Sequence, residues 1–326
     1  MKKACIIAFT GSLLLLINSR VDAQKRDSLL VAGYHAASAV DPDLTSDTAS
    51  CILPFTRVGK LILIKGRADT TEGNFIFDTG SPHLVLNNTY FRDYPLIQAN
   101  FGEETSITGK GDIVARTVVK RFRLGTFTYH STEADLVSLG HIENSRGVKI
   151  LGLLGVSLFK QCEVIIDYEK NLIYLHHISR KERSTYQHEL LKDPTTYYTY
   201  PIEINENRIL VKTAMAKRNL DFVIDFAAET NIIDSRLPGK ILDSIDINGR
   251  ILLAGAGTKK IEALSGILNN FKLQSLDVGA LPVIITNLEN TCFGRENCIN
   301  GVLGYDFLSR YKLGFNFIKR KMYILK

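Results

Sequence analysis

Two aspartates in equivalent positions of the sequence could perform chemistry together. Asp78 follows the apolar residues 75–77, and Asp225 follows the apolar residues 222–224, 147 positions later. Two carboxyl groups held a few ångströms apart cannot both ionise, because like charges repel, so such a pair shares one proton. One carboxylate can then take a proton from water while the other carboxyl polarises a carbonyl group, which is the chemistry that amide hydrolysis requires.

Other segments recur at nearly the same spacing. A Gly-x-Gly segment at 109–111 is matched at 255–257, 146 positions later, and the Gly-Leu-Leu-Gly of 152–155 is matched by Gly-Val-Leu-Gly at 301–304, 149 positions later. Three landmarks in one order and at nearly one offset indicate a duplicated domain. A period this long predicts two homologous lobes, since the repeats of a solenoid are far shorter.

The sequence resembles the aspartic proteases. Residues 75–81 (Phe-Ile-Phe-Asp-Thr-Gly-Ser), followed by an apolar run, resemble their catalytic motif, and the segments 152–155 and 301–304 resemble the second apolar-apolar-Gly element of that fold. The resemblance covers both halves, roughly from residue 50 to 326, and is closer to retropepsin-like domains fused in tandem than to pepsin lobes. It implies an all-β fold of two homologous retropepsin-like (acid protease) β-barrel lobes with a cleft between them, of a bacterial exported type.

The resemblance implies a role for each residue of the first motif. Asp78 and Asp225 would be the catalytic pair, and Thr79 would hydrogen-bond across to the other lobe. Gly80 permits a tight turn and a close approach of its N–H to the carboxylate. Ser81 is expected to bond the outer carboxylate oxygen.

The second motif departs from this pattern. Phe226 stands where the first lobe has Thr79 and cannot form the cross-lobe hydrogen bond. Ala227 replaces Gly80, and a positive φ there would be costly. Ala228 stands at the serine position, where retroviral-type motifs often carry alanine. Two interpretations stay open, an asymmetric but active pair and a second lobe that is a structural remnant.

The Gly-x-Gly segments are candidates for flap tips, which close over a substrate and exclude water. Gly109 and Gly111 follow the first aspartate at a distance comparable to that of Gly255 and Gly257 after the second. The alternative is a pair of ordinary hairpin turns.

Short runs rich in Val, Ile, Leu and aromatic residues predict strands over most of the chain, with short helical turns after 155 and 304 and around 88–94. His83 is expected in a partly exposed loop. The residues between the lobes are charged and end in a proline, which predicts an exposed connector. The predicted organisation is a signal peptide (1–23), an N-terminal arm, removable prosegment or linker (24–50), a first lobe (51–178), a connector (179–194) and a second lobe (195–326).

The N-terminus predicts export to a periplasmic or extracellular location. Two lysines precede the apolar residues 6–17, and the small residues at 21–23 suit a signal peptidase. No later apolar run is long enough to span a membrane. The net charge of +6 is carried by dispersed basic residues, so nothing favours nucleic-acid binding.

Outside the leader, four cysteines remain. Cys292 and Cys298 flank a turn-like loop and are expected to pair, which leaves Cys51 with Cys162 by elimination. The alternative is four free thiols, because cysteine also serves as a small buried apolar residue. The spacing of Cys and His predicts no metal site, and no cofactor is expected.

The sequence therefore favours an aspartic-type endopeptidase acting on peptide or protein substrates, expected to be a monomer. The alternative is a non-catalytic peptide-binding or structural protein whose second lobe has degenerated.

Overall fold

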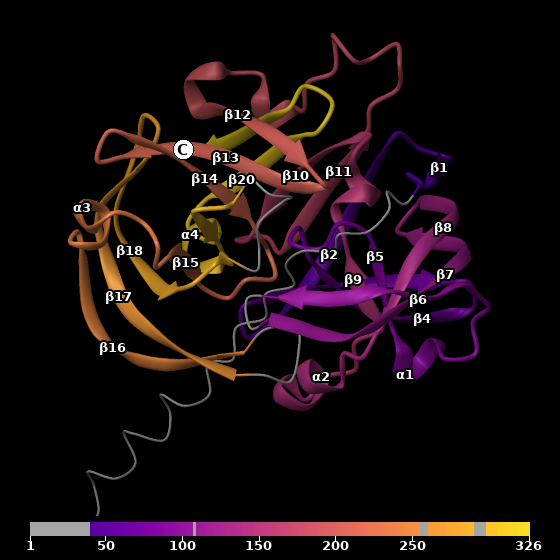
Figure 1. Cartoon of the computed structure of the whole chain (residues 1–326). Helices are drawn as coiled ribbons and strands as arrows, with labels where there is room; N and C mark the ends of the chain where they lie inside the picture. The colour runs from indigo at the N-terminus through magenta and orange to yellow at the C-terminus, as the bar shows by residue number, and fades with distance from the viewer. Residues whose placement is uncertain (1–39, 107–108, 255–259, 290–297) are drawn as a thin grey trace, which may run out of the picture.

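A computed structural model describes residues 40–106, 109–254, 260–289 and 298–326. These residues fold into two lobes of β-strands that share a central sheet, with only short helices between the strands (Figure 1). The predicted all-β fold of two homologous lobes is therefore confirmed.

The central sheet joins the lobes. Its six strands pair antiparallel throughout, and β10 of the first lobe lies beside β20 of the second. All six residues of β10 are buried, as expected for a strand covered on both faces. In spatial order the strands are β2 (Ser50–Val58), β11 (Leu172–His177), β10 (Cys162–Asp167), β20 (Lys312–Asn316), β21 (Lys321–Leu325) and β12 (Tyr197–Asn205).

The first lobe extends from β2. Strand β4 pairs in parallel with β9, β9 pairs antiparallel with β5, and β5 pairs in parallel with β8, which continues into the β7 and β6 ribbon. Strand β1 adds to β8, so part of the predicted N-terminal arm forms an edge strand. The strands are β1 (Asp43–Ser46), β3 (Leu61–Ala68), β4 (Thr71–Phe77), β5 (Leu84–Asn87), β6 (Leu96–Ser106), β7 (Gly109–Leu124), β8 (Phe127–Val137) and β9 (Gly152–Leu154).

The second lobe repeats the pairing of the first-lobe strands β4 to β9. Strand β14 pairs in parallel with β19, β19 antiparallel with β15, and β15 in parallel with β18, which continues into β17 and β16. The duplication inferred from sequence is thus a duplication of topology. The strands are β13 (Arg208–Met215), β14 (Arg218–Ile224), β15 (Asn231–Asp234), β16 (Ile245–Ala254), β17 (Lys260–Leu273), β18 (Leu276–Thr286) and β19 (Gly301–Leu303).

The described helices are short. The three that the sequence predicts are present as η2 (Val156–Phe159), α4 (Tyr305–Leu308) and α1 (Asn88–Phe91), while the remaining ones are α2 (Gly140–Arg146), α3 (Gly239–Leu242), η3 (Glu189–Leu191) and η4 (Pro194–Thr196). None of the described helices is long and apolar enough to cross a membrane.

The segment between the lobes is mostly exposed, but several of its residues contact the central sheet. Leu191 is buried, and the ring of Tyr186 stacks on that of His176 with centroids 3.5 Å apart. The connector therefore packs against the central sheet.

The predicted pairing of Cys51 with Cys162 is wrong, because both are free buried thiols. Strand β11 lies between their strands, with Leu175 opposite Cys51 and His177 opposite Cys162. Two strand spacings of about 4.8 Å put the Cα atoms of Cys51 and Cys162 at least about 10 Å apart, beyond the roughly 7 Å between Cα atoms that a disulfide can bridge. Cys298 is disulfide-bonded, whereas Cys292 lies outside the described residues, so the pairing of these two stays a prediction.

Candidate functional site

Each aspartate of the predicted pair stands at the end of a buried strand. Asp78 follows β4, and its N–H donates to the carbonyl of Leu154 at 3.1 Å; Asp225 follows β14, and its N–H donates to Leu303 at 3.0 Å. The acceptors belong to β9 and β19, which the two recurring glycine segments form. The repeated landmarks of the sequence therefore hold the two aspartates in equivalent positions.

The two carboxyl groups accept equivalent hydrogen bonds. Oδ1 of Asp78 accepts the backbone N–H groups of Gly80 (2.9 Å) and Ser81 (3.2 Å), and Oδ1 of Asp225 accepts those of Ala227 (2.8 Å) and Ala228 (3.1 Å). Two backbone donors on one oxygen fix the orientation of each carboxyl and leave the other oxygen available for chemistry.

The two carboxyls meet at the junction of the lobes. A Cβ placed on Gly80 would lie 2.5 Å from Oδ2 of Asp225, so the loop of the first lobe is packed directly against the carboxyl of the second. Both side chains are buried. Burial, and then repulsion from Asp225, raises the pKa of Asp78 well above its usual value, and burial raises the pKa of Asp225 to about 6.

Thr79 forms the cross-lobe contact that the resemblance implies. Its Oγ1 donates to the carbonyl of Ile224 at 2.8 Å and accepts the N–H of Phe226 at 3.2 Å. One hydroxyl of the first lobe therefore bonds two backbone groups of the second.

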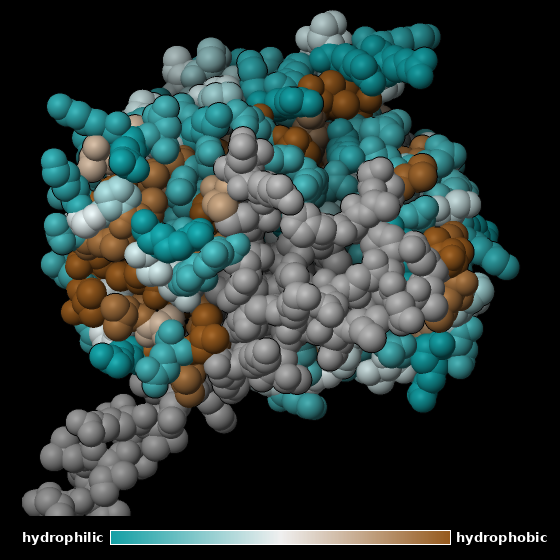
Figure 2. Space-filling view, viewed as in Figure 1, coloured by the Kyte–Doolittle hydropathy of each residue, from teal (hydrophilic) through white to brown (hydrophobic). Residues whose placement is uncertain are grey.

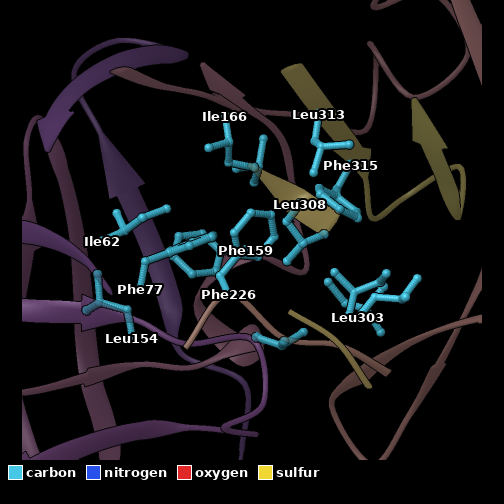
Figure 3. Close-up of a cluster of buried hydrophobic side chains, with 14 of the residues drawn as sticks. Ile62, Phe77, Leu154, Phe159, Ile166, Phe226, Leu303, Leu308, Leu313 and Phe315 are labelled. Carbon is cyan, nitrogen blue, oxygen red and sulfur yellow. The ribbon is translucent and has the colours of Figure 1, made fainter. Parts of the chain in front are cut away.

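Phe226 fills the equivalent position with an aromatic contact. Its ring lies 5.1 Å from that of Phe77 and 5.8 Å from that of Phe315, and Phe77 in turn contacts Phe159 at 5.3 Å. Figure 3 shows Phe226 between the first-lobe side chains and those of Leu308 and Phe315. Apolar packing thus replaces the second cross-lobe hydrogen bond.

Ala227 carries no backbone penalty. Gly80 and Ala227 both lie in the described part of the chain, and neither has a positive φ. The cost that the sequence led us to expect is therefore absent. Ala227 is buried in a cluster otherwise made of first-lobe residues, which include Leu61 and Ile76.

Two sequence expectations about nearby side chains are wrong. The Ser81 hydroxyl donates to the carbonyl of His83 at 3.4 Å, and the outer oxygen of Asp78 accepts no hydrogen bond from it. His83 is buried, not partly exposed, and burial lowers its pKa to about 4. The imidazole is consequently neutral above that pH.

Arg208, at the start of β13, is a member of the site that the sequence analysis missed. Its side chain is buried and interacts electrostatically with Asp225 and Asp78, and burial lowers its pKa to about 10. The 147-residue offset of the aspartates aligns Arg208 with Leu61. A cation at an otherwise apolar strand position was the signal that could have revealed it.

A polar cluster links the two lobes beside the pair. The Lys60 ammonium donates to the carbonyl of Glu229 at 2.9 Å and to the carboxylate of Asp306, and Arg146 pairs with the Glu229 carboxylate at 2.5 Å. These partly buried contacts restrict how the lobes move relative to each other.

One pair of the candidate flap glycines lies in a described hairpin, that of β6 and β7. Gly109 and Gly111 belong to β7, where Gly109 pairs with Ser106 of β6; Gly255 and Gly257, between β16 and β17, lie outside the described residues. The hairpins extend from opposite lobes toward the middle of the molecule (Figure 1).

The outer strands of these hairpins carry apolar surface. Figure 2 shows apolar residues gathered over the β16–β18 side of the second lobe. Exposed large apolar side chains occur on both outer strands: Leu96 and Ile97 of β6, and Ile247 and Leu252 of β16.

Among the described residues, no group of three or more His, Cys, Asp or Glu side chains is arranged to hold a metal ion. The groups described at the site are the two carboxyls, their backbone donors and Arg208.

Comparison with known proteins agrees with this site in the first lobe. Residues 64–158, which include Asp78, match the family model described as aspartyl protease. Solved structures that match the chain include conglutin gamma, a basic 7S globulin from lupine seeds (11% identity, 87% of this chain and 95% of that chain, TM-score 0.45), and basic 7S globulin from soybean (8% identity, 87% and 95%, TM-score 0.44). None of the curated proteins matches the sequence.

Proposed function

We propose that this protein is an aspartic-type endopeptidase that hydrolyses peptide bonds with the pair Asp78 and Asp225. The observation that carries the proposal is the interaction of two buried carboxyls from different lobes, each held by two backbone N–H groups. The raised pKa of Asp78 keeps a proton on the pair when Asp225 is ionised, as this chemistry needs.

The reaction proceeds in two steps, the formation and the breakdown of a tetrahedral intermediate. The ionised carboxyl takes a proton from water as the water oxygen bonds to the carbonyl carbon, and the protonated carboxyl gives its proton to the carbonyl oxygen, which forms a tetrahedral diol. The C–N bond then breaks as the nitrogen receives the proton taken from water, and one hydroxyl of the diol returns a proton to the other carboxyl. The pair ends in its starting state.

The cross-lobe contacts serve this chemistry by fixing the distance between the carboxyls. Thr79 bonds two backbone groups of the second lobe, and Phe226 packs against the first. A rigid pair keeps the reacting groups aligned, and a misplacement of about 1 Å can cost about 100-fold in rate.

The test compares the purified protein with Asp78→Asn and Asp225→Asn, which keep the shape of each side chain and remove its acid. A denatured protein substrate is incubated with each protein from pH 3 to 8, and new termini are read by mass spectrometry. The matched control is Asp47→Asn, at an exposed aspartate of the N-terminal arm. The proposal expects cleavage by the parent and the control alone; no cleavage by any folded protein at any pH would overturn it.

The second candidate is a peptide-binding protein without turnover. Phe226 and Ala227, which replace the threonine and glycine of the first motif, are the observation that favours it. A peptide whose scissile amide is replaced by a hydroxyl-bearing tetrahedral carbon separates the two functions. An enzyme binds this mimic more tightly than the parent peptide and cuts the parent, whereas a binding protein prefers neither and leaves the parent intact.

We further propose that the protein is exported and acts as a monomer on peptides or proteins. The basic and apolar N-terminus supports export, and the presence of both aspartates in one chain supports the monomer. Detection of the mature N-terminus outside the cytoplasm, together with the native mass, tests both points.

A further inference from the structure

The residue opposite Asp225 in the second lobe is an arginine. Strands β13 and β14 pair with Leu210 opposite Val223. Continuing this antiparallel register by two residues sets Arg208 opposite Asp225 on the same face of the ribbon. Side chains directly opposite in such a pair have Cβ atoms about 5 Å apart. Arg208 is buried there, so its charge is poorly screened by water.

The residue opposite Asp78 in the first lobe is apolar. Strands β3 and β4 pair with Leu63 opposite Ile76, and the same two-residue continuation sets Leu61 opposite Asp78. Leu61 is buried in an apolar cluster. The two lobes share one topology, and Leu61 and Arg208 occupy equivalent positions in it. The two aspartates therefore differ in that a cation lies opposite Asp225 only.

The backbone donors do not distinguish the two aspartates, since each carboxyl accepts two N–H groups at similar distances. Among the described residues that act on the pair, Arg208 is the cation, and Glu206 in the turn before β13 acts on Arg208. Further charged or titratable side chains lie on the neighbouring loops and short helices: His83, Lys60, Arg146, Glu229 and Asp306.

We propose that Arg208 is a positioning residue that places the negative charge of the pair on Asp225 and leaves the shared proton on Asp78. For its catalytic meaning this inference rests on the proposed function. Asp225 is then the base that takes the proton from water, and Asp78 is the acid that gives its proton to the carbonyl oxygen. The roles exchange in the second step, when Asp225 donates to the departing nitrogen and Asp78 recovers a proton.

The direction of the pKa shifts agrees. Arg208 lowers the pKa of Asp225, which burial otherwise raises, whereas burial and the charge of Asp225 both raise that of Asp78. The ionised form is consequently favoured at Asp225.

The first experiment does not depend on activity. Each carboxyl is titrated alone by carbon-detected NMR of labelled aspartate, Asp225 in an Asp78→Asn protein and Asp78 in an Asp225→Asn protein. We expect the lower pKa at Asp225. Adding Arg208→Leu, which copies Leu61, should raise the pKa of Asp225 by about one unit, and Arg208→Lys should keep it low. The control is Arg218→Leu at an exposed position of the same ribbon.

The second experiment uses the otherwise unmutated enzyme. Arg208→Leu should shift the acidic limb of the kcat/KM profile upward by about one pH unit, and Arg208→Lys should restore it. His83→Gln, which removes a neighbouring group with a pKa of about 4, should leave that shift in place. A merely structural role of Arg208 would lower kcat/KM at every pH without moving the limb.

The outcomes separate this inference from the proposed function. If Asp225 keeps its pKa when Arg208 becomes Leu, or if Asp78 has the lower pKa of the two, the inference is overturned, whatever the activity. If the predicted titration shift occurs but no protein cleaves a peptide, the charge assignment stands and the proposed function fails. Should Arg208→Leu not fold, Arg208→Met keeps the stem and serves in its place.

Discussion

The loops at residues 78–81 and 225–228 show how two copies of one motif can keep a geometry with different side chains. Both present a carboxyl on two backbone N–H groups, and both are anchored to a neighbouring parallel strand. They differ in the contacts across the junction, where the first lobe uses a threonine hydroxyl and the second a phenylalanine ring. Backbone N–H groups therefore orient the carboxyls, whereas the side chains of Thr79 and Phe226 hold the two lobes together.

The difference between Gly80 and Ala227 follows from what each faces. A methyl group on Gly80 would meet the Asp225 carboxyl at 2.5 Å, whereas the methyl group of Ala227 is accommodated among first-lobe apolar residues. The two carboxyls therefore cannot be related by exact symmetry. An asymmetric pair is compatible with catalysis, because the two carboxyls have different roles.

The largest expected effect is on stability, at Phe226. Phe226→Ala removes a buried ring that contacts Phe77 and Phe315, and should lower the free energy of unfolding by about 3–5 kcal/mol. Phe226→Thr should lower the free energy of unfolding by less, because the introduced hydroxyl can form cross-lobe hydrogen bonds like those of Thr79. Denaturant unfolding measures both; equal losses would mean that the second lobe cannot use a threonine.

The next largest effect is on kcat/KM, and it differs between substitutions at Gly80 and at Ala227. Gly80→Ala forces the Asp225 carboxyl to move and should lower kcat/KM about 100-fold, as expected for a displacement near 1 Å. The reverse exchange, Ala227→Gly, should change kcat/KM only a few-fold, since no positive φ has to be satisfied there. Similar losses in the two variants would contradict the asymmetry described above.

Removing the cross-lobe hydroxyl should have a somewhat smaller effect. Thr79→Val leaves the buried carbonyl of Ile224 and the N–H of Phe226 without their partner, which should lower the free energy of unfolding by about 2–3 kcal/mol. Thr79→Ser keeps the hydroxyl and should retain most of this stability. If serine behaves like valine, the methyl group and not the hydrogen bonds accounts for the loss.

The smallest effect is a dependence of stability on pH. The folded-state pKa values of Asp225 and Asp78 are raised, so the folded protein keeps protons that the unfolded chain releases near pH 4. The contribution of Asp225 is complete below that pH and is lost as the pH rises through about 6, where Asp225 ionises, whereas that of Asp78 persists to higher pH. Between pH 4 and 6 the expected decline from Asp225 is about 2 kcal/mol.

Urea unfolding at several pH values checks this slope. The double variant with Asp78→Asn and Asp225→Asn should lose the decline, while Asp47→Asn should keep it. A decline that persists in the double variant would assign it to other groups.

Much of the fold and the centre of the site could be predicted from the sequence. Local patterns of apolar residues gave the strands, and the recurring glycines gave the duplication, because Gly155 and Gly304 pack against loop backbone where a Cβ would lie 2.1 Å and 2.4 Å away. Only glycine fits such a close contact, so the packing appears in the sequence as a glycine at both equivalent positions. The ends of the two strands then placed Asp78 and Asp225 together.

The sequence alone therefore determined the strands of each lobe, the duplication of the lobes and the ends of the strands that carry the two aspartates. The tertiary structure decided what lies across strands and across lobes: that Cys51 and Cys162 are too far apart to pair, that Ser81 bonds a carbonyl, that His83 is buried and that Phe226 replaces a hydrogen bond by packing. Arg208 combines the two kinds of information. The sequence repeat aligns it with Leu61, but only the register of β13 and β14 places it near Asp225. Local patterns encode backbone conformation, whereas distances between side chains arise only when the strands are assembled.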